Sequence, residues 1–300
     1  MKRTAVILGI LSFALWAAAQ NSGKPAPQTP PAAGQTAPAT PGAPAPPQGK
    51  RPPQAKSEAE LTAWKAAAAS TDAATIEKGA DDFAAKFPDS ELRVLLYQTA
   101  MRLYQNANNA DKTEATGRKV LSLDADSPEA LVIVAEVIAE KTRDSDIDKD
   151  QRFGEATSMA QKATQTVDTD ISVPAGAPQD KIDAYKALLR SQAYSILGTI
   201  EFKKENFPGA QDYLQKSIDV YPSDPDPVVI LRLALALDKQ GKYPDALKAA
   251  NRVVGMTQEN TPIGTPARRE RDRLQQLTGG AAPAPAPAPA PAQPPTPPKN

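Results

Sequence analysis

The strongest candidate for chemistry in this sequence is a run of acidic residues in a stretch that we expect to separate two helices. Within residues 144–155, carboxylates stand at positions one, three, five, seven and twelve, as Asp144, Asp146, Asp148, Asp150 and Glu155. Carboxylate oxygens at this spacing can surround a hard cation such as Ca²⁺, and a final Glu can bind it through both oxygens. The chemistry to consider first is therefore cation binding.

This spacing resembles the calcium loop of an EF-hand, with two departures. Lys149 stands where the loop needs Gly for a sharp turn, and it adds a positive charge to the site. Gln151 occupies a position that is usually apolar. The other interpretation is a solvated acidic turn in which Asp150 caps the following helix. We expect no metal site here, and a calcium-responsive adaptor remains an alternative.

Two residue types that carry much of enzyme chemistry are missing. The 300 residues include no His and no Cys. The chain therefore lacks the commonest general base, a thiolate nucleophile and the usual ligands of structural zinc. A catalytic site would have to use carboxylates, Lys, Ser or Tyr alone. We expect a protein that is not an enzyme and that has no cofactor.

The balance of charge does not favour a nucleic-acid partner. Lys and Arg number 35, Asp and Glu also number 35, and the formal net charge is zero. Proteins that bind nucleic acids normally show a basic face. One local cluster, the arginines of 268–273, is interleaved with acidic residues. It could contact acidic lipid or nucleic acid, but the interleaving also fits an exposed, charge-laced helix face. We expect no nucleic-acid partner.

The beginning of the chain has the pattern of an export signal. Lys2 and Arg3 precede an apolar run over residues 5–16, and three alanines then stand before Gln20. This arrangement is typical of a bacterial secretory signal peptide, and the apolar run is short for a membrane span. We expect residues 1–19 to be a signal peptide, with an uncleaved anchor as the alternative. The mature chain would have no membrane span and no cysteine for lipidation, and it would be exported to the periplasm or cell envelope.

Two proline-rich arms flank the middle of the chain. Of the 300 residues 31 are Pro, and most of them fall in residues 20–56 and 281–300. Such composition cannot bury a core, so we expect a disordered Pro/Ala-rich linker and a disordered Ala-Pro-rich tail. The arms could act as spacers, as docking strips for a proline-binding partner, or as passive solubilising segments.

Residues 57–280 are expected to form one helix after another. Ser57 with Glu60, and Asp111 with Glu114, have the spacing of capping boxes, and Thr265-Pro266 has the pattern of an N-cap followed by a first-turn proline. Gly279 follows the last apolar repeat, as a helix-terminating glycine does. No stretch alternates apolar and polar residues as a half-buried strand would. The pattern predicts an all-α fold of antiparallel helices with short loops.

An internal repeat gives these helices an order. The segment Phe207-Pro208-Gly209-Ala210 recurs as Tyr243-Pro244-Asp245-Ala246, about 36 residues later. Repeats of this length stack, because each unit buries its apolar face only against its neighbours. We therefore expect an α-solenoid.

The repeat residues resemble the tetratricopeptide (TPR) family, whose unit is two antiparallel helices. Tyr194, Leu197 and Gly198 stand where the family pattern places them, and small residues such as Ala210 and Ala246 would let the helices approach. The best-matching repeats are 191–224 and 227–260. Weaker matches cover 57–90, 94–127 and 128–168, and residues 265–278 are expected to form a capping helix at the end.

The resemblance implies that the function is to bind a protein or peptide in a groove lined by the first helix of each pair. On the family pattern that groove would include Gln98, Arg102, Glu136, Glu140, Thr199, Phe202, Lys203, Arg232 and Lys239. Each of these residues could instead belong to a solvated helix face. Three alternatives stay open: a structural spacer or assembly factor of the envelope that acts through its arms, the calcium-responsive adaptor, and a homo-oligomer formed by stacked solenoid ends.

Overall fold

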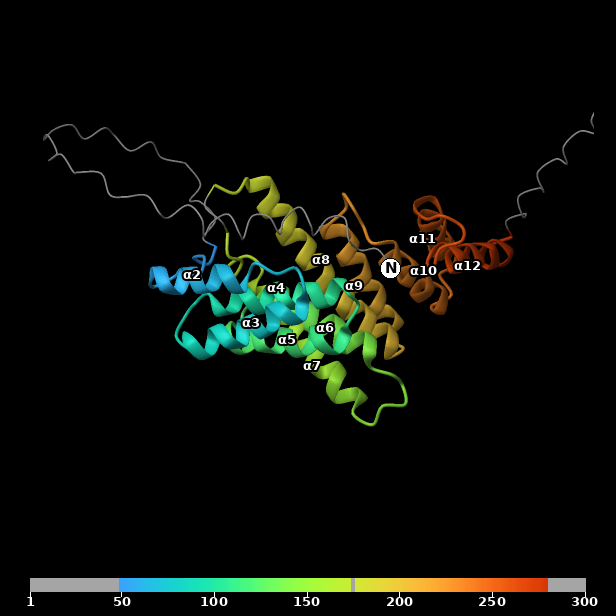
Figure 1. Ribbon diagram of the computed structural model, residues 1–300. Coiled ribbons are helices and arrows are strands. Elements are labelled where there is room, and N and C mark those ends of the chain that lie inside the picture. Colours follow the sequence, from blue (N-terminus) through green and yellow to red (C-terminus); the bar gives the residue numbers. More distant parts are fainter. Residues whose placement is uncertain (1–48, 174–175, 280–300) are drawn as a thin grey trace, which may run out of the picture.

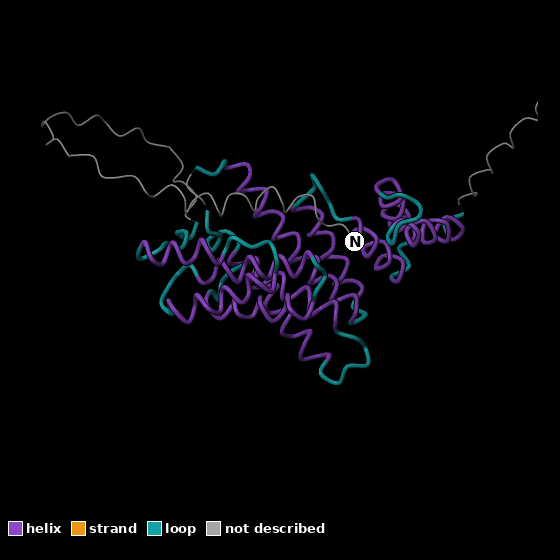
Figure 2. Tube along the Cα trace, viewed as in Figure 1, coloured by secondary structure: helices purple, strands orange, loops and turns teal. Residues whose placement is uncertain are grey.

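The computed structural model describes residues 49–173 and 176–279, and these form an array of helices (Figure 1). The predictions made for residues 1–19, 20–48 and 281–300 lie outside the described residues. The helices are α2 (Glu58–Ala67), α3 (Ala73–Lys86), α4 (Arg93–Asn106), α5 (Ala110–Leu123), α6 (Pro128–Lys141), α7 (Lys149–Thr166), α8 (Gln179–Lys203), α9 (Phe207–Val220), α10 (Pro227–Lys239), α11 (Tyr243–Met256) and α12 (Gly264–Leu277). In the described ranges there is no β-sheet, as Figure 2 also shows.

Several helices begin where a side-chain oxygen caps the first turn. The Ser57 hydroxyl accepts a hydrogen bond from the amide of Glu60 at 3.1 Å, which confirms the first predicted capping position. Asp72 accepts from the amide of Thr75 at 2.8 Å at the start of α3. Such caps satisfy amide groups that have no partner inside the helix.

The N-caps predicted at Asp111 and Thr265 each lie two residues after the observed ones. Helix α5 begins at Ala110 because the side chain of Asn109 accepts from the amide of Lys112 at 3.2 Å, so Asp111 lies inside the first turn. Helix α12 begins at Gly264, whose amide donates to the hydroxyl of Thr261 at 2.9 Å. In both places an oxygen earlier in the chain reaches the free amides first.

The helices pack as a solenoid of antiparallel pairs. Each helix packs mainly against the next one in the chain, and α6 with α8, α8 with α10 and α10 with α12 are also in contact. These contacts bring first helices of successive pairs next to one another along one side of the stack, which we call the inner side. Figure 1 shows the stack running from α2 at one end to α12 at the other. The predicted fold class, an all-α TPR-like solenoid, is confirmed.

Small residues set how closely the helices approach. A methyl group added at Gly198 of α8 would lie 2.6 Å from Cγ of Leu214 in α9. At Gly117 of α5, where a larger apolar residue is usual in the family pattern, an added methyl group would lie 2.4 Å from a methyl carbon of Val134 in α6. Ala210 is fully buried between its neighbours. The helices are therefore fitted to the small size of the residues at these positions.

Two features depart from a regular repeat. Helix α8 has 25 residues, and its first half precedes the predicted repeat 191–224. In that half Leu189 packs against Val167 and Ile171 of the α7–α8 connection. At the other end α12 covers α10 and α11 with the buried side chains of Ala267 and Leu274. None of the helices in the described ranges combines the length and the apolar character needed to cross a bilayer.

Candidate interaction surface

The nine predicted partner-binding residues all lie on first helices of the pairs. They are Gln98 and Arg102 on α4, Glu136 and Glu140 on α6, Thr199, Phe202 and Lys203 on α8, and Arg232 and Lys239 on α10. Their contacts fall into separate groups along the stack. That any of them contacts a partner remains a prediction.

Five of the nine residues come together at the centre of the inner side. We call Glu136, Glu140, Thr199, Lys203 and Arg232 the central polar cluster. Arg232 donates to the hydroxyl of Thr199 at 2.5 Å and forms an ion pair with Glu140 at 3.4 Å. Residues of α6, α8 and α10 are thereby joined, although up to 92 positions of sequence separate them.

The ammonium group of Lys203 is used to cap the end of α6. It donates to the backbone oxygens of Ala139 at 2.6 Å, Thr142 at 3.1 Å and Glu140 at 3.2 Å. A cation at a helix C-terminus is favourable because the last carbonyls carry partial negative charge. Burial lowers the pKa of Lys203, an effect that Glu140 opposes and Arg232 reinforces.

The central polar cluster encloses little space. Glu136, Glu140, Thr199 and Arg232 line a hollow of about 10 Å³ together with Ser195 and two apolar residues. A volume of that order holds about one water molecule. The cluster can offer charge and hydrogen bonds to a partner lying across it, but it has no pocket for a side chain.

Arg102 is engaged inside the molecule. Its guanidinium forms a bidentate ion pair with Glu129 of α6, and the Nε–Oε1 distance is 2.5 Å. Only 17% of the Arg102 side chain and 14% of the Glu129 side chain are exposed. The phenol of Tyr185 in α8 also interacts with this pair, and burial raises the pKa of that phenol. Arg102 therefore joins three first helices.

The remaining predicted residues differ in their surroundings. Phe202 packs edge-to-face against Phe207 with ring centroids 5.5 Å apart, and it contacts the core of the last repeats. Lys239 is exposed at the end of α10. Gln98 lines the larger cavity at the N-terminal end of the solenoid.

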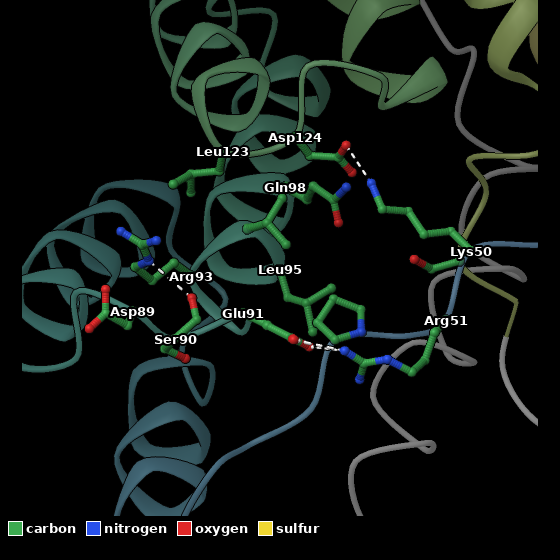
Figure 3. Close-up of a pocket in the computed structure, with 13 residues that line it drawn as sticks. Lys50, Arg51, Asp89, Ser90, Glu91, Arg93, Leu95, Gln98, Leu123 and Asp124 are labelled. Carbon is green, nitrogen blue, oxygen red and sulfur yellow. Dashed lines mark hydrogen bonds and ion pairs between the residues drawn. The ribbon is translucent and has the colours of Figure 1, made fainter.

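That larger cavity, which we call the N-terminal cavity, has a volume of about 430 Å³ and lies between α4, the end of α5 and the chain before α2 (Figure 3). Two ion pairs cross its edge. Lys50 contacts Asp124 at 2.6 Å, and Arg51 contacts Glu91 at 2.7 Å. The apolar side chains of Val94, Leu95 and Leu123 line it with Pro53.

Reasoning from the sequence did not identify the N-terminal cavity. Lys50 and Arg51 belong to the end of the predicted disordered linker 20–56, where they were visible as two adjacent cations in a proline-rich stretch. The structure places residues 49–56 against the helices. The carboxylate partner of Arg51 lies 40 positions later in the chain, and that of Lys50 lies 74 positions later. No periodic pattern links such positions.

The acidic segment 144–155 is not arranged as a calcium loop. Helix α7 begins at Lys149, in the middle of the segment, and Glu155 lies within the helix and pairs with Arg118 of α5 at 2.6 Å. Asp146 accepts a hydrogen bond from the amide of Arg143 at 2.8 Å. Within the described ranges, no three acidic side chains come together as metal ligands would.

Comparison with known proteins gives matches in structure only. No protein-family model matches the chain, and no curated protein matches its sequence. Three solved structures illustrate the structural similarity. YrrB, a TPR protein with an unusual peptide-binding site, aligns with 18% identity and a TM-score of 0.40, over 62% of this chain and 78% of its own.

The other two structures give similar values. TTC0263, a thermophilic TPR protein in Thermus thermophilus, aligns with 12% identity and a TM-score of 0.38, over 73% of this chain and 100% of its own. Acl4, the assembly chaperone of RpL4, aligns with 12% identity and a TM-score of 0.39, over 73% and 98%. Because these TM-scores are 0.40 or lower, the solenoid assignment rests on the helix packing of this chain itself.

Proposed function

We propose that this protein is a non-catalytic scaffold that holds a peptide or partner protein on the inner side of its solenoid, on α4, α6, α8 and α10. The observation that carries the proposal is the central polar cluster. Three first helices place Glu140, Lys203 and Arg232 side by side. A polar patch built from separate repeats is suited to an extended partner that crosses several helices.

The proposal includes a location. The pattern of residues 1–19 supports export to the periplasm or cell envelope. Mass spectrometry of the protein purified from its own host should then give a chain that begins at Gln20. A chain retaining Met1 would contradict cleavage and favour the uncleaved anchor.

Affinity capture from envelope extract with the full-length protein tests the binding surface. Glu140 and Lys239 are suitable positions because the Glu140 side chain is 51% exposed and Lys239 is exposed on α10. We expect Glu140→Lys and Lys239→Glu to lose the partner, because each reverses a charge that the partner would face. Lys248→Glu, on the exposed side of α11, is the matched control and should keep it.

Two results would count against the proposal or redirect it. If Glu140→Lys and Lys239→Glu capture the partner as well as the control does, the inner side is not the binding surface. If capture is lost only when residues 281–300 are deleted, the function belongs to the proline-rich tail and the solenoid is a spacer. Thermal melting of each variant must match that of the wild type, because only then does a loss of capture report on the surface.

A further inference from the structure

The chain that precedes α2 is held by charge against the residues just before α4 and just after α5. Lys50 and Arg51 both reach toward the helices, Lys50 to Asp124 at the end of α5 and Arg51 to Glu91 just before α4 (Figure 3). The Glu91 carboxylate receives two hydrogen bonds from the Arg51 guanidinium, at 2.7 and 2.9 Å. We call residues 49–56 the arm segment.

The backbone of the arm segment is held as well. The amide of Gln54 donates to Glu91 at 3.1 Å, and Lys50 forms a parallel bridge with Ser172 of the α7–α8 connection. The Lys56 ammonium donates to the backbone oxygen of Asp89 at 2.7 Å. Backbone contacts of this kind, combined with separate contacts for alternate side chains, are how proteins bind extended peptides.

An apolar wall and free volume accompany these polar contacts. Val94 and Leu95 are partly exposed beside Pro53, and Leu123 is 37% exposed at the end of α5. The N-terminal cavity therefore keeps about 430 Å³ open next to the arm segment. Besides the arm segment, this space is lined by three carboxylates, those of Asp89, Glu91 and Asp124, by the guanidinium of Arg93, and by apolar side chains.

We propose that the N-terminal cavity is a binding site for an extended basic peptide with two adjacent cations followed by prolines, and that the arm segment, Gly-Lys-Arg-Pro-Pro-Gln-Ala-Lys, is its intramolecular ligand. Charge complementarity carries the assignment, because Asp124 and Glu91 each match one of the two cations. A partner segment of the same chemistry binds by displacing the arm segment. The inference deepens the proposed function by giving one part of the inner side a partner class.

The arm segment is held weakly enough to be displaced. The side chains of Arg51 and Glu91 are 59% and 41% exposed, and exposed ion pairs contribute little because water and salt screen them. What favours the arm segment is its covalent attachment, since a short tether gives an effective concentration on the order of millimolar. A free peptide must compete with that concentration unless the arm segment is released.

Fluorescence anisotropy with a labelled synthetic peptide of residues 48–57 tests this inference on the full-length protein. In the arm variant Lys50→Glu/Arg51→Glu, Glu91 and Asp124 repel the arm segment, while the residues of the helices that line the cavity are unchanged. We expect this variant to bind the peptide at least about tenfold more tightly than the wild type, because the intramolecular competitor is gone. Adding Glu91→Lys/Asp124→Lys to the arm variant should abolish binding.

Three controls test whether peptide binding depends on the charges of the cavity and of the peptide. Lys78→Glu/Asp82→Lys, which reverses an exposed ion pair on α3, should leave peptide binding as in the wild type. A peptide with Glu at both cation positions should not bind the arm variant. Raised salt should weaken the binding of the basic peptide, since exposed charges are screened.

A second measurement does not depend on the peptide. In the otherwise unchanged protein, Glu91→Lys should remove the hydrogen-exchange protection of the Gln54 amide, because its acceptor is lost. The inference is overturned if the arm variant fails to bind the peptide, or if it binds no more tightly than the wild type. It is also overturned if the wild type forms dimers that the arm variant abolishes, since the site would then hold the arm segment of a second copy. Any of these results leaves the capture experiment on α6 and α10 unaffected.

Discussion

At Gly198 the closeness of two helices depends on one missing methyl group. The backbone of α8 lies so near Leu214 that an added Cβ would be 2.6 Å from Cγ and 3.1 Å from the backbone nitrogen of that residue. The backbone atom cannot move without moving α9. Gly154 in α7 is the opposite case, because nothing lies within 4 Å of its would-be Cβ.

The two glycines should therefore respond to alanine with opposite signs. Gly198→Ala should lower the free energy of unfolding by about 1–3 kcal/mol, as overpacking in a tight core does. Gly154→Ala should raise it by about 0.5–1 kcal/mol, since Ala is the better helix former and meets no obstruction. Urea unfolding monitored by circular dichroism measures both. Equal effects at the two sites would show that close packing at Gly198 does not make an added methyl group destabilising.

At the scale of elements, a polar network ties α3, α4 and α5 together. Glu77 of α3 accepts from the hydroxyl of Tyr104 at 2.7 Å, from Lys112 at 3.0 Å and from Lys119 at 3.2 Å. Burial alone would raise the pKa of Glu77, but these hydrogen bonds outweigh it and lower the pKa from its ordinary value of 4.5. Burial and the bond to Glu77 raise the pKa of Tyr104 to about 12.

This network predicts a loss of stability in acid. Between the lowered pKa of folded Glu77 and its ordinary value of 4.5, the unfolded chain binds the proton and the folded chain does not. The stabilisation is thus present above the ordinary value and is lost as the pH falls through the lowered one. Urea midpoints of the wild type and Glu77→Gln should converge as the pH is lowered through this window. A constant difference between the two would contradict the role of the Glu77 charge.

At the scale of the whole molecule, the last helix closes the stack. Each helix pair buries its apolar side against the next pair. The final pair must therefore be covered by a helix whose own outer side is polar. Helix α12 supplies it, with Leu274 fully buried against α10 and α11 and Leu277 50% exposed on the same helix.

Replacing these two leucines by alanine measures how much the packing of α12 stabilises the end of the solenoid. Leu274→Ala should cost about 2–5 kcal/mol of unfolding free energy, as truncation of a buried leucine does. Leu277→Ala should stay within about 0.5 kcal/mol of the wild type, as exposed positions do. Thermal and urea unfolding give both values. Similar losses at the two positions would mean that α12 does not seal the end of the solenoid.

Much of the architecture could be predicted from the sequence because it depends on near neighbours in the chain. Helix positions follow from apolar spacing and from caps such as Ser57, and the recurrence of Phe207-Pro208 as Tyr243-Pro244 follows the stacking of pairs. The small residue at Gly198 is expected from the resemblance to the TPR pattern. The cap at Asn109 was missed because a second capping pattern followed two residues later.

The candidate site depended on contacts between distant parts of the chain. The sequence by itself, through its resemblance to the TPR pattern, determined the expectation that first helices carry Arg102, Glu140 and Arg232. Only the tertiary structure decided that Arg102 is engaged by Glu129 and that the arm segment pairs with Glu91. The physical reason is that a charge pairs with whichever opposite charge the stacked helices bring within a few ångströms. That distance depends on how all the pairs pack, and on no local pattern.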